Sequence, residues 1–222
     1  MPEYPWRFLK TGSGILARRK LDLHVTGQEH LPRRGPVIIA ARHYHHLYDG
    51  VAMHLALPYP VKILVGLDWV GNAPGKRAMT ALCKAAGWPV VHRPDPRNPA
   101  PATDRAAILR QGMTDALAVL DAGQALLVFP EGFPTIDPGY TPKQQDDEFL
   151  PFAPGVTRIA TLAAARGLDV PIVPAGFHYR KGDRWDITLR FGEPVHVRNR
   201  TEADAALADL ESRVIALSQP PA

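Results

Sequence analysis

Three histidines and one aspartate lie within seven residues of the chain: His43, His45, His46 and Asp49. An imidazole titrates near neutral pH and can take a proton from an attacking hydroxyl, provided that a carboxylate fixes its tautomer. We therefore predict a general base in this cluster. Either His43 or His45 is the base, and Asp49 is the residue that orients it.

The same cluster admits a second chemistry, because closely spaced histidines with an aspartate can also bind a metal ion. The segment is similar to the HxHxDH loop of metallo-β-lactamase-like hydrolases, but residues 47 and 48 are Leu and Tyr where that loop has Asp and His. Two ligands are therefore missing, and we expect no metal and no cofactor. A metal-dependent hydrolase that uses the cluster from His43 to His46 with Asp49 as ligands is the alternative function.

A second candidate lies after the apolar segment at residues 126–129, where the chain continues Pro-Glu-Gly. Proline cannot continue a central strand, and glycine permits a close approach of another molecule to the backbone. Glu131 and Gly132 are therefore predicted to bind substrate where this strand ends. The plainer alternative is a turn that ends the strand and carries an exposed glutamate.

Strand-like and helix-like segments alternate along the chain, which indicates an α/β fold with a largely parallel sheet flanked by helices. The predicted strands are residues 21–26, 37–41, 61–65, 89–92, 125–129, 171–175 and 185–191, and the predicted helices are residues 50–57, 76–86, 103–122, 155–166 and 202–217. From their number, the 222 residues are expected to form a single domain, 1–222. In such sheets ligands bind beyond the carboxyl ends of the strands, where both candidate segments lie.

The remaining long segment, residues 130–154, is rich in proline and has no period of its own. A connection of that length inside a compact domain is usually a lid or a binding loop. We expect it to cover part of the site.

Composition narrows the class of protein. Apolar residues make up 45% of the chain and charged residues 22%, which is typical of a folded globular domain. No apolar run approaches the roughly 18 residues of a membrane-spanning helix. The N-terminus does not resemble a secretory signal, and one cysteine cannot form an internal disulfide, so a cytoplasmic location is expected.

Positive charge is concentrated at the N-terminus. Residues 1–34 contain seven Lys/Arg and three Asp/Glu, a difference that equals the net charge of +4 for the whole chain. With apolar and basic residues on opposite sides of a helical wheel, residues 1–20 are predicted to form an amphipathic helix on an anionic membrane surface, at the cytoplasmic face. The alternative is a helix whose apolar side packs on the domain. Nucleic acid is not expected, because the basic stretch lacks interleaved aromatic residues.

Four segments together resemble the lysophospholipid acyltransferases, the bacterial 1-acylglycerol-3-phosphate acyltransferase family. Residues 35–49 resemble its NHxxxxD block, residues 87–93 its second block ending in Arg, residues 129–132 its FPEG block, and residues 170–174 its VPIVP block. The resemblance implies transfer of a fatty acyl group from acyl-CoA or acyl carrier protein to a hydroxyl of a lysophospholipid or a related glycerolipid or glycolipid. It also implies a membrane-peripheral enzyme of lipid metabolism.

In that family the histidine of the first block is the base, the aspartate orients it, and no covalent acyl-enzyme forms. Here five residues separate His43 from Asp49, where the family has four. Counting from the end of the strand selects His43, while a one-residue insertion would give the role to His45. We favour His43 and keep His45 as the second choice.

The chain departs from the family at two positions that concern the acceptor. Residues 133–135 read Phe-Pro-Thr where the family has Thr-Arg-Ser, and Ala153-Pro154 replaces a basic pair before Gly155. The resemblance therefore leaves Arg93 as the candidate for binding a phosphate, which suits its planar guanidinium. The alternative for Arg93 is a surface charge in a proline-rich loop, so a phosphorylated and an uncharged acceptor both stay open.

Overall fold

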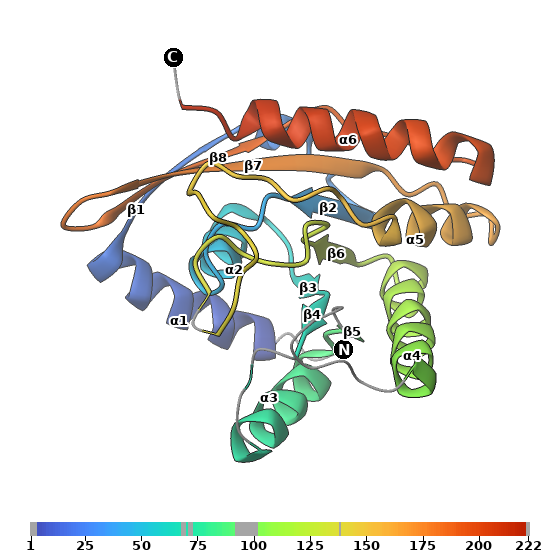
Figure 1. Ribbon diagram of the computed structural model, residues 1–222, viewed down its shortest axis with the longest axis horizontal. Helices are drawn as coiled ribbons and strands as arrows, with labels where there is room; N and C mark the ends of the chain where they lie inside the picture. The colour runs from blue at the N-terminus through green and yellow to red at the C-terminus, as the bar shows by residue number, and fades with distance from the viewer. Residues whose placement is uncertain (1–3, 68–69, 71–72, 92–101, 138, 221–222) are drawn as a thin grey trace.

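The computed structural model describes residues 4–67, 70, 73–91, 102–137 and 139–220, with the backbone alone at residues 4–10, 73 and 102–105 (Figure 1). The helices are α1 Tyr4–Lys20, α2 Tyr48–Ala56, α3 Ala73–Ala86, α4 Ala102–Asp121, α5 Gly155–Ala164 and α6 Ala203–Leu217, with short 3-10 turns η1 Gln28–His30 and η2 Arg200–Glu202. The strands are β1 Leu21–Thr26, β2 Val37–Ala41, β3 Val61–Ile63, β4 Val65–Gly66, β5 Val90–Val91, β6 Ala125–Val128, β7 Ile172–Lys181 and β8 Trp185–Phe191.

Six strands form the main sheet in the order β1-β8-β7-β2-β6-β3. Strands β7, β2, β6 and β3 run parallel, β8 returns antiparallel to β7, and β1 pairs parallel with β8. At the centre, Ile39 pairs with Leu127 of β6 and Val173 of β7. The predicted single α/β domain with a largely parallel sheet flanked by helices is confirmed.

The side chains of the central strands alternate between two apolar layers, as the period of a strand requires. Val37, Ile39 and Ala41 of β2 pack in the layer that includes α2 and Leu16 of α1, which we call the open face of the sheet. Ile38 and Ala40 of the same strand pack in the layer that includes α4, α5 and α6, which we call the closed face. Figure 1 shows α6 and α5 on one side of the sheet and α1 and α2 on the other.

Most predicted elements differ from the observed ones by only a few residues at their ends, but two strands differ in their pairing. The strand predicted at residues 61–65 divides into β3 and β4, because Leu64 N donates to Leu127 O (2.9 Å) and Val65 N donates to Pro89 O (2.9 Å). The chain therefore leaves the main sheet at residue 64 and forms a separate parallel pair with β5. The strand predicted at residues 171–175 extends to Lys181 because it pairs with β8 over its outer half.

The N-terminal segment is helical, as predicted, and α1 packs against α2 and β1. Leu16 and Ala17 contact the apolar layer of the open face, whereas Ile15 is 58% exposed. Within the described part of the chain, no helix combines the length and the apolar content that a membrane span needs.

Candidate active site

The candidate residues lie at the carboxyl ends of adjacent parallel strands, where ligands bind in sheets of this kind. Strand β2 ends at Ala41 and leads into His43, and strand β6 ends at Val128 and leads into Glu131. Asp49 follows in the first turn of α2. The sheet therefore brings the two predicted segments together.

His43 and Asp49 form a hydrogen-bonded pair. The distance from His43 Nδ1 to Asp49 Oδ2 is 2.9 Å, and the Asp49 side chain has no exposed surface. Since a carboxylate can only accept, the proton lies on Nδ1 and His43 Nε2 is the nitrogen that can take up another. The five intervening residues do not prevent the pairing.

Asp49 is held by four donors. Its Oδ2 accepts from His43 Nδ1 and from the backbone N–H groups of Tyr44 (2.8 Å) and His45 (3.0 Å). Its Oδ1 accepts from the Tyr179 hydroxyl at 2.6 Å. These bonds fix the carboxylate, and through it the His43 ring, in one orientation.

Tyr179 is a site residue that the sequence analysis missed. It lies on the outer half of β7, is buried, and stacks on Tyr44 with ring centroids 4.4 Å apart. Burial and the neighbouring Asp49 raise the pKa of Tyr179 well above its ordinary value, so the hydroxyl stays protonated and donates. No motif marks this position, and 130 residues separate it from Asp49.

The His43 ring lies against Phe129 in a stacked arrangement, with centroids 4.1 Å apart and planes inclined by 14°. Its side chain is 14% exposed and forms part of the wall of a pocket. The pair is therefore buried at Asp49 and accessible at His43.

His45 has a different environment. Its Nδ1 accepts from the backbone N–H groups of Leu47 (3.2 Å) and Tyr48 (3.4 Å). Helix α2 begins at Tyr48, two residues before the predicted start, and Leu47 directly precedes it. Burial lowers the pKa of His45 to about 4, so the ring stays neutral at pH 7 and keeps this acceptor. His45 therefore caps a helix, and His46 lies on the exposed rim of the pocket.

The metal alternative requires several ligand side chains close together. Within residues 4–67, 70, 73–91, 102–137 and 139–220, no three His, Cys, Asp or Glu side chains are arranged to hold a metal ion. Asp49 Oδ2 is instead surrounded by N–H donors.

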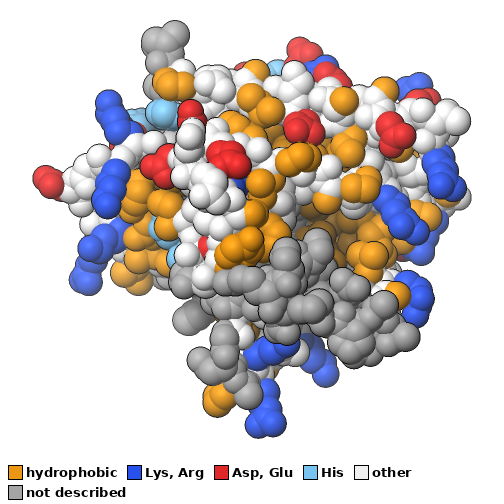
Figure 2. Space-filling model, viewed as in Figure 1, with side chains coloured by type: hydrophobic (Ala, Val, Ile, Leu, Met, Phe, Trp, Pro, Cys, Tyr) orange, Lys and Arg blue, Asp and Glu red, His pale blue; other side chains and the backbone are white. Residues whose placement is uncertain are grey.

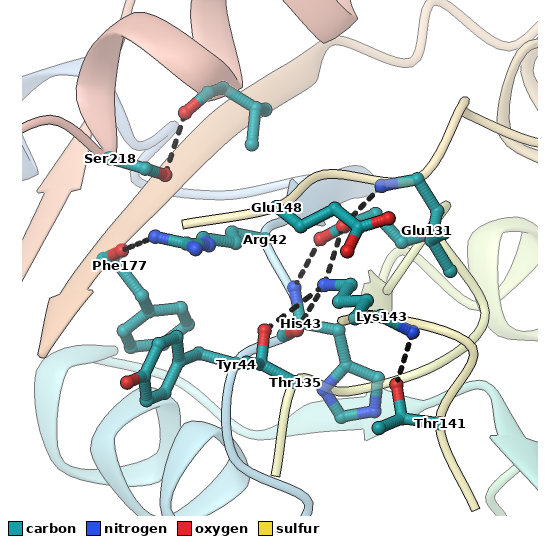
Figure 3. Close-up of polar contacts among 12 residues, drawn as sticks. Arg42, His43, Tyr44, Glu131, Thr135, Thr141, Lys143, Glu148, Phe177 and Ser218 are labelled. Carbon is teal, nitrogen blue, oxygen red and sulfur yellow. Dashed lines mark hydrogen bonds and ion pairs between the residues drawn. The ribbon is translucent and has the colours of Figure 1, made fainter. Parts of the chain in front are cut away.

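Glu131 lies in the site, but its carboxylate has no exposed surface. Its Oε1 accepts from His43 N (2.8 Å), and its Oε2 accepts from Leu150 N (3.0 Å) and pairs with Lys143 Nζ (2.6 Å). Figure 3 shows Glu131 and Lys143 beside the His43 backbone. The expectation that Glu131 binds substrate does not fit this placement, because both of its oxygens are engaged inside the protein.

Gly132, the other predicted substrate contact, does line the pocket. Its φ of 76° is in the left-handed region that favours glycine, and Gly132 N donates to Phe129 O (3.0 Å) in the turn after β6. The turn directs the backbone past the pocket wall while Glu131 points inward.

The long loop at residues 130–154 is held down by buried cationic side chains. Arg42 Nη2 donates to Asp146 O (2.8 Å), and its guanidinium lies 4.2 Å from the centroid of the Phe149 ring. Arg42 Nη1 donates to Phe177 O (3.2 Å) of β7, so one side chain joins the loop to the sheet. The sequence analysis predicted a loop over the site but not these anchors.

The pocket beside His43 has a volume of about 540 Å³ and is lined mainly by apolar side chains of the open face. These include Leu16, Val51, Ile63, Met79, Leu82 and Trp88. Among the lining residues that the structure describes there is no Lys or Arg, and the one carboxylate is that of Asp137. Arg93, the predicted phosphate contact, lies outside the described residues.

Comparisons with known proteins bear on the fold and the family of the chain. A comparison with curated proteins gave no match. Among solved structures, the chain is similar to the 1-acyl-sn-glycerophosphate (LPA) acyltransferase PlsC from Thermotoga maritima, with 18% identity and a TM-score of 0.64 over 96% of this chain and 76% of that chain. That likeness shows a shared fold. The model of the acyltransferase family matches residues 22–178. The family predicted from the four sequence blocks is confirmed, and the chain belongs to the acyltransferase family.

Proposed function

We propose that this acyltransferase moves a fatty acyl group from an acyl thioester to a hydroxyl of a lysophospholipid or related glycerolipid, with His43 as general base. The observation that carries the proposal is the hydrogen bond between His43 and Asp49 on the wall of an apolar pocket. The PlsC structure with the same fold is that of an LPA acyltransferase, which agrees with a lysolipid acceptor.

The geometry supports a direct transfer. A lipid hydroxyl beside His43 would give its proton to Nε2 as its oxygen attacks the thioester carbonyl, and the thiolate would leave and recover a proton from the imidazolium. Asp49 keeps the ring in the tautomer that can accept, and stabilises the imidazolium that forms. A positioned base of this kind contributes about 10²–10⁴-fold to the rate.

The pocket is proposed to hold the fatty acyl chain. Its volume of about 540 Å³ lies within the range of ligand pockets, and its lining offers apolar contact along α1, α2 and α3. The donor thiol carrier, whether coenzyme A or acyl carrier protein, would then remain outside the pocket.

Two kinds of acceptor head group are proposed, phosphorylated or uncharged, because the described pocket lining has no Lys or Arg to pair with a phosphate. A charge-assisted Arg contact to a buried phosphate contributes about 1.5–3 kcal/mol, or roughly 10- to 100-fold in binding. Arg93 is the candidate for this contact. Without it, an acceptor with an uncharged head group fits the pocket better.

The experiment measures thiol release together with acylated lipid, using acyl-CoA and acyl carrier protein as donors, and lysophosphatidate and a neutral lysolipid as acceptors. Wild type is compared with Arg93→Ala and with Arg158→Ala, an exposed arginine of α5 on the closed face that serves as the control. Either Arg93→Ala abolishes most lysophosphatidate acylation, or the neutral lysolipid is preferred. A strong lysophosphatidate preference that is indifferent to Arg93 contradicts both branches, and no acylation of any lipid hydroxyl contradicts the proposed function.

We further propose that the mouth of the pocket docks on an anionic membrane. Leu47 (47% exposed) and Leu82 of α3 (43%) line the pocket and are exposed at its mouth. Ile15 (58%) lies on α1, which also lines the pocket. Helices α1 and α3 also carry exposed basic residues: Arg18, Arg19 and Lys20 on α1, and Lys76, Arg77 and Lys84 on α3. Figure 2 shows Lys and Arg side chains at the lower end of the molecule, where α3 lies. A bilayer there would deliver its lipids directly to the pocket.

The docking is tested by sedimentation with anionic vesicles at low and high salt. Ile15→Glu should weaken the attachment several-fold, whereas Leu109→Glu, which changes an exposed leucine of α4, should not. Each Lys or Arg near the surface contributes about 1 kcal/mol, so salt should weaken binding as well. Deleting residues 1–20 is a less specific test, because α1 also lines the pocket. Equal sedimentation of the two point variants would contradict a membrane site at this mouth.

A further inference from the structure

We propose that Lys143, acting with Glu131 as a buried ion pair, is a positioning residue that fixes the backbone of His43 and so aims its ring. The inference rests on the proposed role of His43 as the base. Neither residue touches the pocket, so neither is a catalytic residue.

The two side chains engage both hydrogen-bonding groups of the His43 backbone, as Figure 3 shows. Glu131 Oε1 accepts from His43 N at 2.8 Å, and Lys143 Nζ donates to His43 O at 2.9 Å. The pair itself closes at 2.6 Å between Lys143 Nζ and Glu131 Oε2. Thr135 adds to this clamp, because its N donates to His43 O (3.2 Å) and its Oγ1 accepts from Lys143 Nζ (3.3 Å).

Burial argues for a purpose beyond stability. Neither side chain has exposed surface, and a buried ion pair is often no more stable than an apolar pair of the same volume. Burial lowers the pKa of Lys143, and the neighbouring Glu131 charge opposes that shift and so helps to keep Lys143 charged. What an apolar pair could not provide is an acceptor and a donor for the two backbone groups of His43.

The direction of the His43 ring depends on those groups. With the peptide on each side of the Cα fixed, the side chain leaves the backbone along one line and meets both Asp49 and Phe129. Productive geometry requires placement within about 0.5 Å and 10–20°. An error of about 1 Å in the position of a reacting group can cost on the order of 10²-fold in rate.

The clamp also carries charge, so removing one of its charges should change the pH dependence of the reaction. Lys143→Met would remove the ion-pair partner of Glu131, whose carboxylate keeps only its hydrogen bonds from His43 N and Leu150 N. The other charges near Glu131, those of Arg42 and Asp49, stay in place, so the surroundings of His43 become more negative by one charge. A more negative environment favours the protonated imidazolium. The acidic limb of the pH dependence of kcat/KM should therefore move to higher pH, an effect that a merely structural loss would not produce.

The experiment compares Lys143→Met, the charge-neutral double variant Glu131→Gln/Lys143→Met, and Arg166→Met. The last removes an exposed ion pair with Asp121 at the same 2.6 Å distance and serves as the matched control. Each variant is measured for kcat, KM for the acyl donor, the pH profile and thermal unfolding. The double variant removes both charges of the Glu131–Lys143 pair, so it supplies a folded protein if Lys143→Met alone does not fold.

Lys143→Met is expected to lower kcat about 10- to 100-fold with KM changed less than about 3-fold, and to move the acidic limb to higher pH. In the double variant, the acidic limb of the pH dependence of kcat/KM should return to its wild-type pH while kcat stays low. Arg166→Met should match wild type in both measurements. A folded Lys143→Met with kcat within about 2-fold of wild type, or an activity loss in both variants that follows the unfolded fraction alone, overturns the inference.

His43→Ala, measured in parallel, separates this inference from the proposed function. An inactive His43→Ala with a normal Lys143→Met refutes the positioning role only. An active, folded His43→Ala refutes the base assignment, and with it the reason for the clamp.

Discussion

On the closed face of the sheet, the alternate side chains of β2 and β6 meet the apolar residues of α4, α5 and α6. On the open face, the same two strands lead at their carboxyl ends into His43 and Glu131, beside a pocket of about 540 Å³. One face is filled by packing, and the other combines an apolar wall with buried polar groups.

The two faces differ in the free-energy cost of burying charged side chains, which falls on the open face. Arg42, Asp49, Glu131 and Lys143 are all buried around the site, and a buried charge is unfavourable unless it is paired and hydrogen-bonded. Each of the four has hydrogen-bond partners among the described residues, and most of these contacts converge on the segment from Arg42 to His45. We infer that the closed face supplies stability and the open face uses part of it to hold His43 and Asp49 in place.

The largest effect should come from breaking the open face at Asp49. Asp49→Ala and Asp49→Asn are expected to reduce acyl transfer by about 10²–10⁴-fold, because base and orienter act as a unit. Steady-state thiol release, corrected for the folded fraction by circular dichroism, measures the loss. A folded variant that loses less than about 10-fold would refute the role of Asp49.

The closed face should respond in the opposite way. Leu120 of α4 has no exposed surface, and Leu120→Ala should lower the free energy of unfolding by about 2–5 kcal/mol. The kcat/KM of the remaining folded enzyme should stay within about 2-fold, because the cavity lies in the layer away from the pocket. Denaturant titration and kinetics on the same samples test this, and a specific loss of turnover would remove the distinction between the faces.

His45 should affect stability on the open face without affecting chemistry. Burial lowers its pKa to about 4 from 6.5, so the unfolded chain binds the proton more readily than the folded chain between these values. Its contribution is therefore present above pH 6.5 and is lost as the pH falls toward 4, by about 1–3 kcal/mol. His45→Asn keeps an acceptor for the N–H groups of α2 and should flatten this part of the stability curve. Parallel curves for the two proteins would contradict the assignment.

A smaller effect on kcat should come from the hydrogen bond between Tyr179 and Asp49. Tyr179→Phe removes the donor to Asp49 Oδ1 and should lower kcat about 10-fold, in line with a hydrogen bond to a charged group. Tyr59→Phe is the matched control, because Tyr59 Oη is buried without a hydrogen-bond partner among the described residues. Kinetics that do not differ between the two variants would show that Tyr179 only fills space.

The smallest effect concerns the apolar wall. Leu82→Trp on α3 should shorten the preferred acyl chain, at a cost of about 0.8 kcal/mol, or about 4-fold in kcat/KM, for each methylene that no longer fits. Leu109→Trp on α4 should leave the chain-length preference unchanged. A preference that does not move in Leu82→Trp would place the acyl chain elsewhere.

Much of the site was predictable because it is local. Strand β2 and the polar residues after it are contiguous in the sequence, and the alternation of strands and helices predicted the sheet edge where they meet Glu131. The direction of the Glu131 side chain was not predictable. A Pro-Glu-Gly turn shows where a strand ends but not whether the carboxylate faces solvent or the interior.

The remainder depends on contacts between distant parts of the chain. Lys143 and His43 are 100 residues apart, and Tyr179 and Asp49 are 130 apart. No helical or strand period relates such positions, and both partner residues lie outside the recognised sequence blocks. The division of residues 61–65 between two sheets has the same origin, because the partner strand β5 follows only after α3.

The most direct test of the central claim, that His43 rather than His45 is the base, is thiol release coupled to lipid acylation in His43→Ala and His45→Ala side by side. His43→Ala should lose at least about 10²-fold with its fold retained, and His45→Ala should lose clearly less. Thioester cleavage at near the wild-type rate in a folded His43→Ala, with loss of activity in His45→Ala, would contradict the assignment.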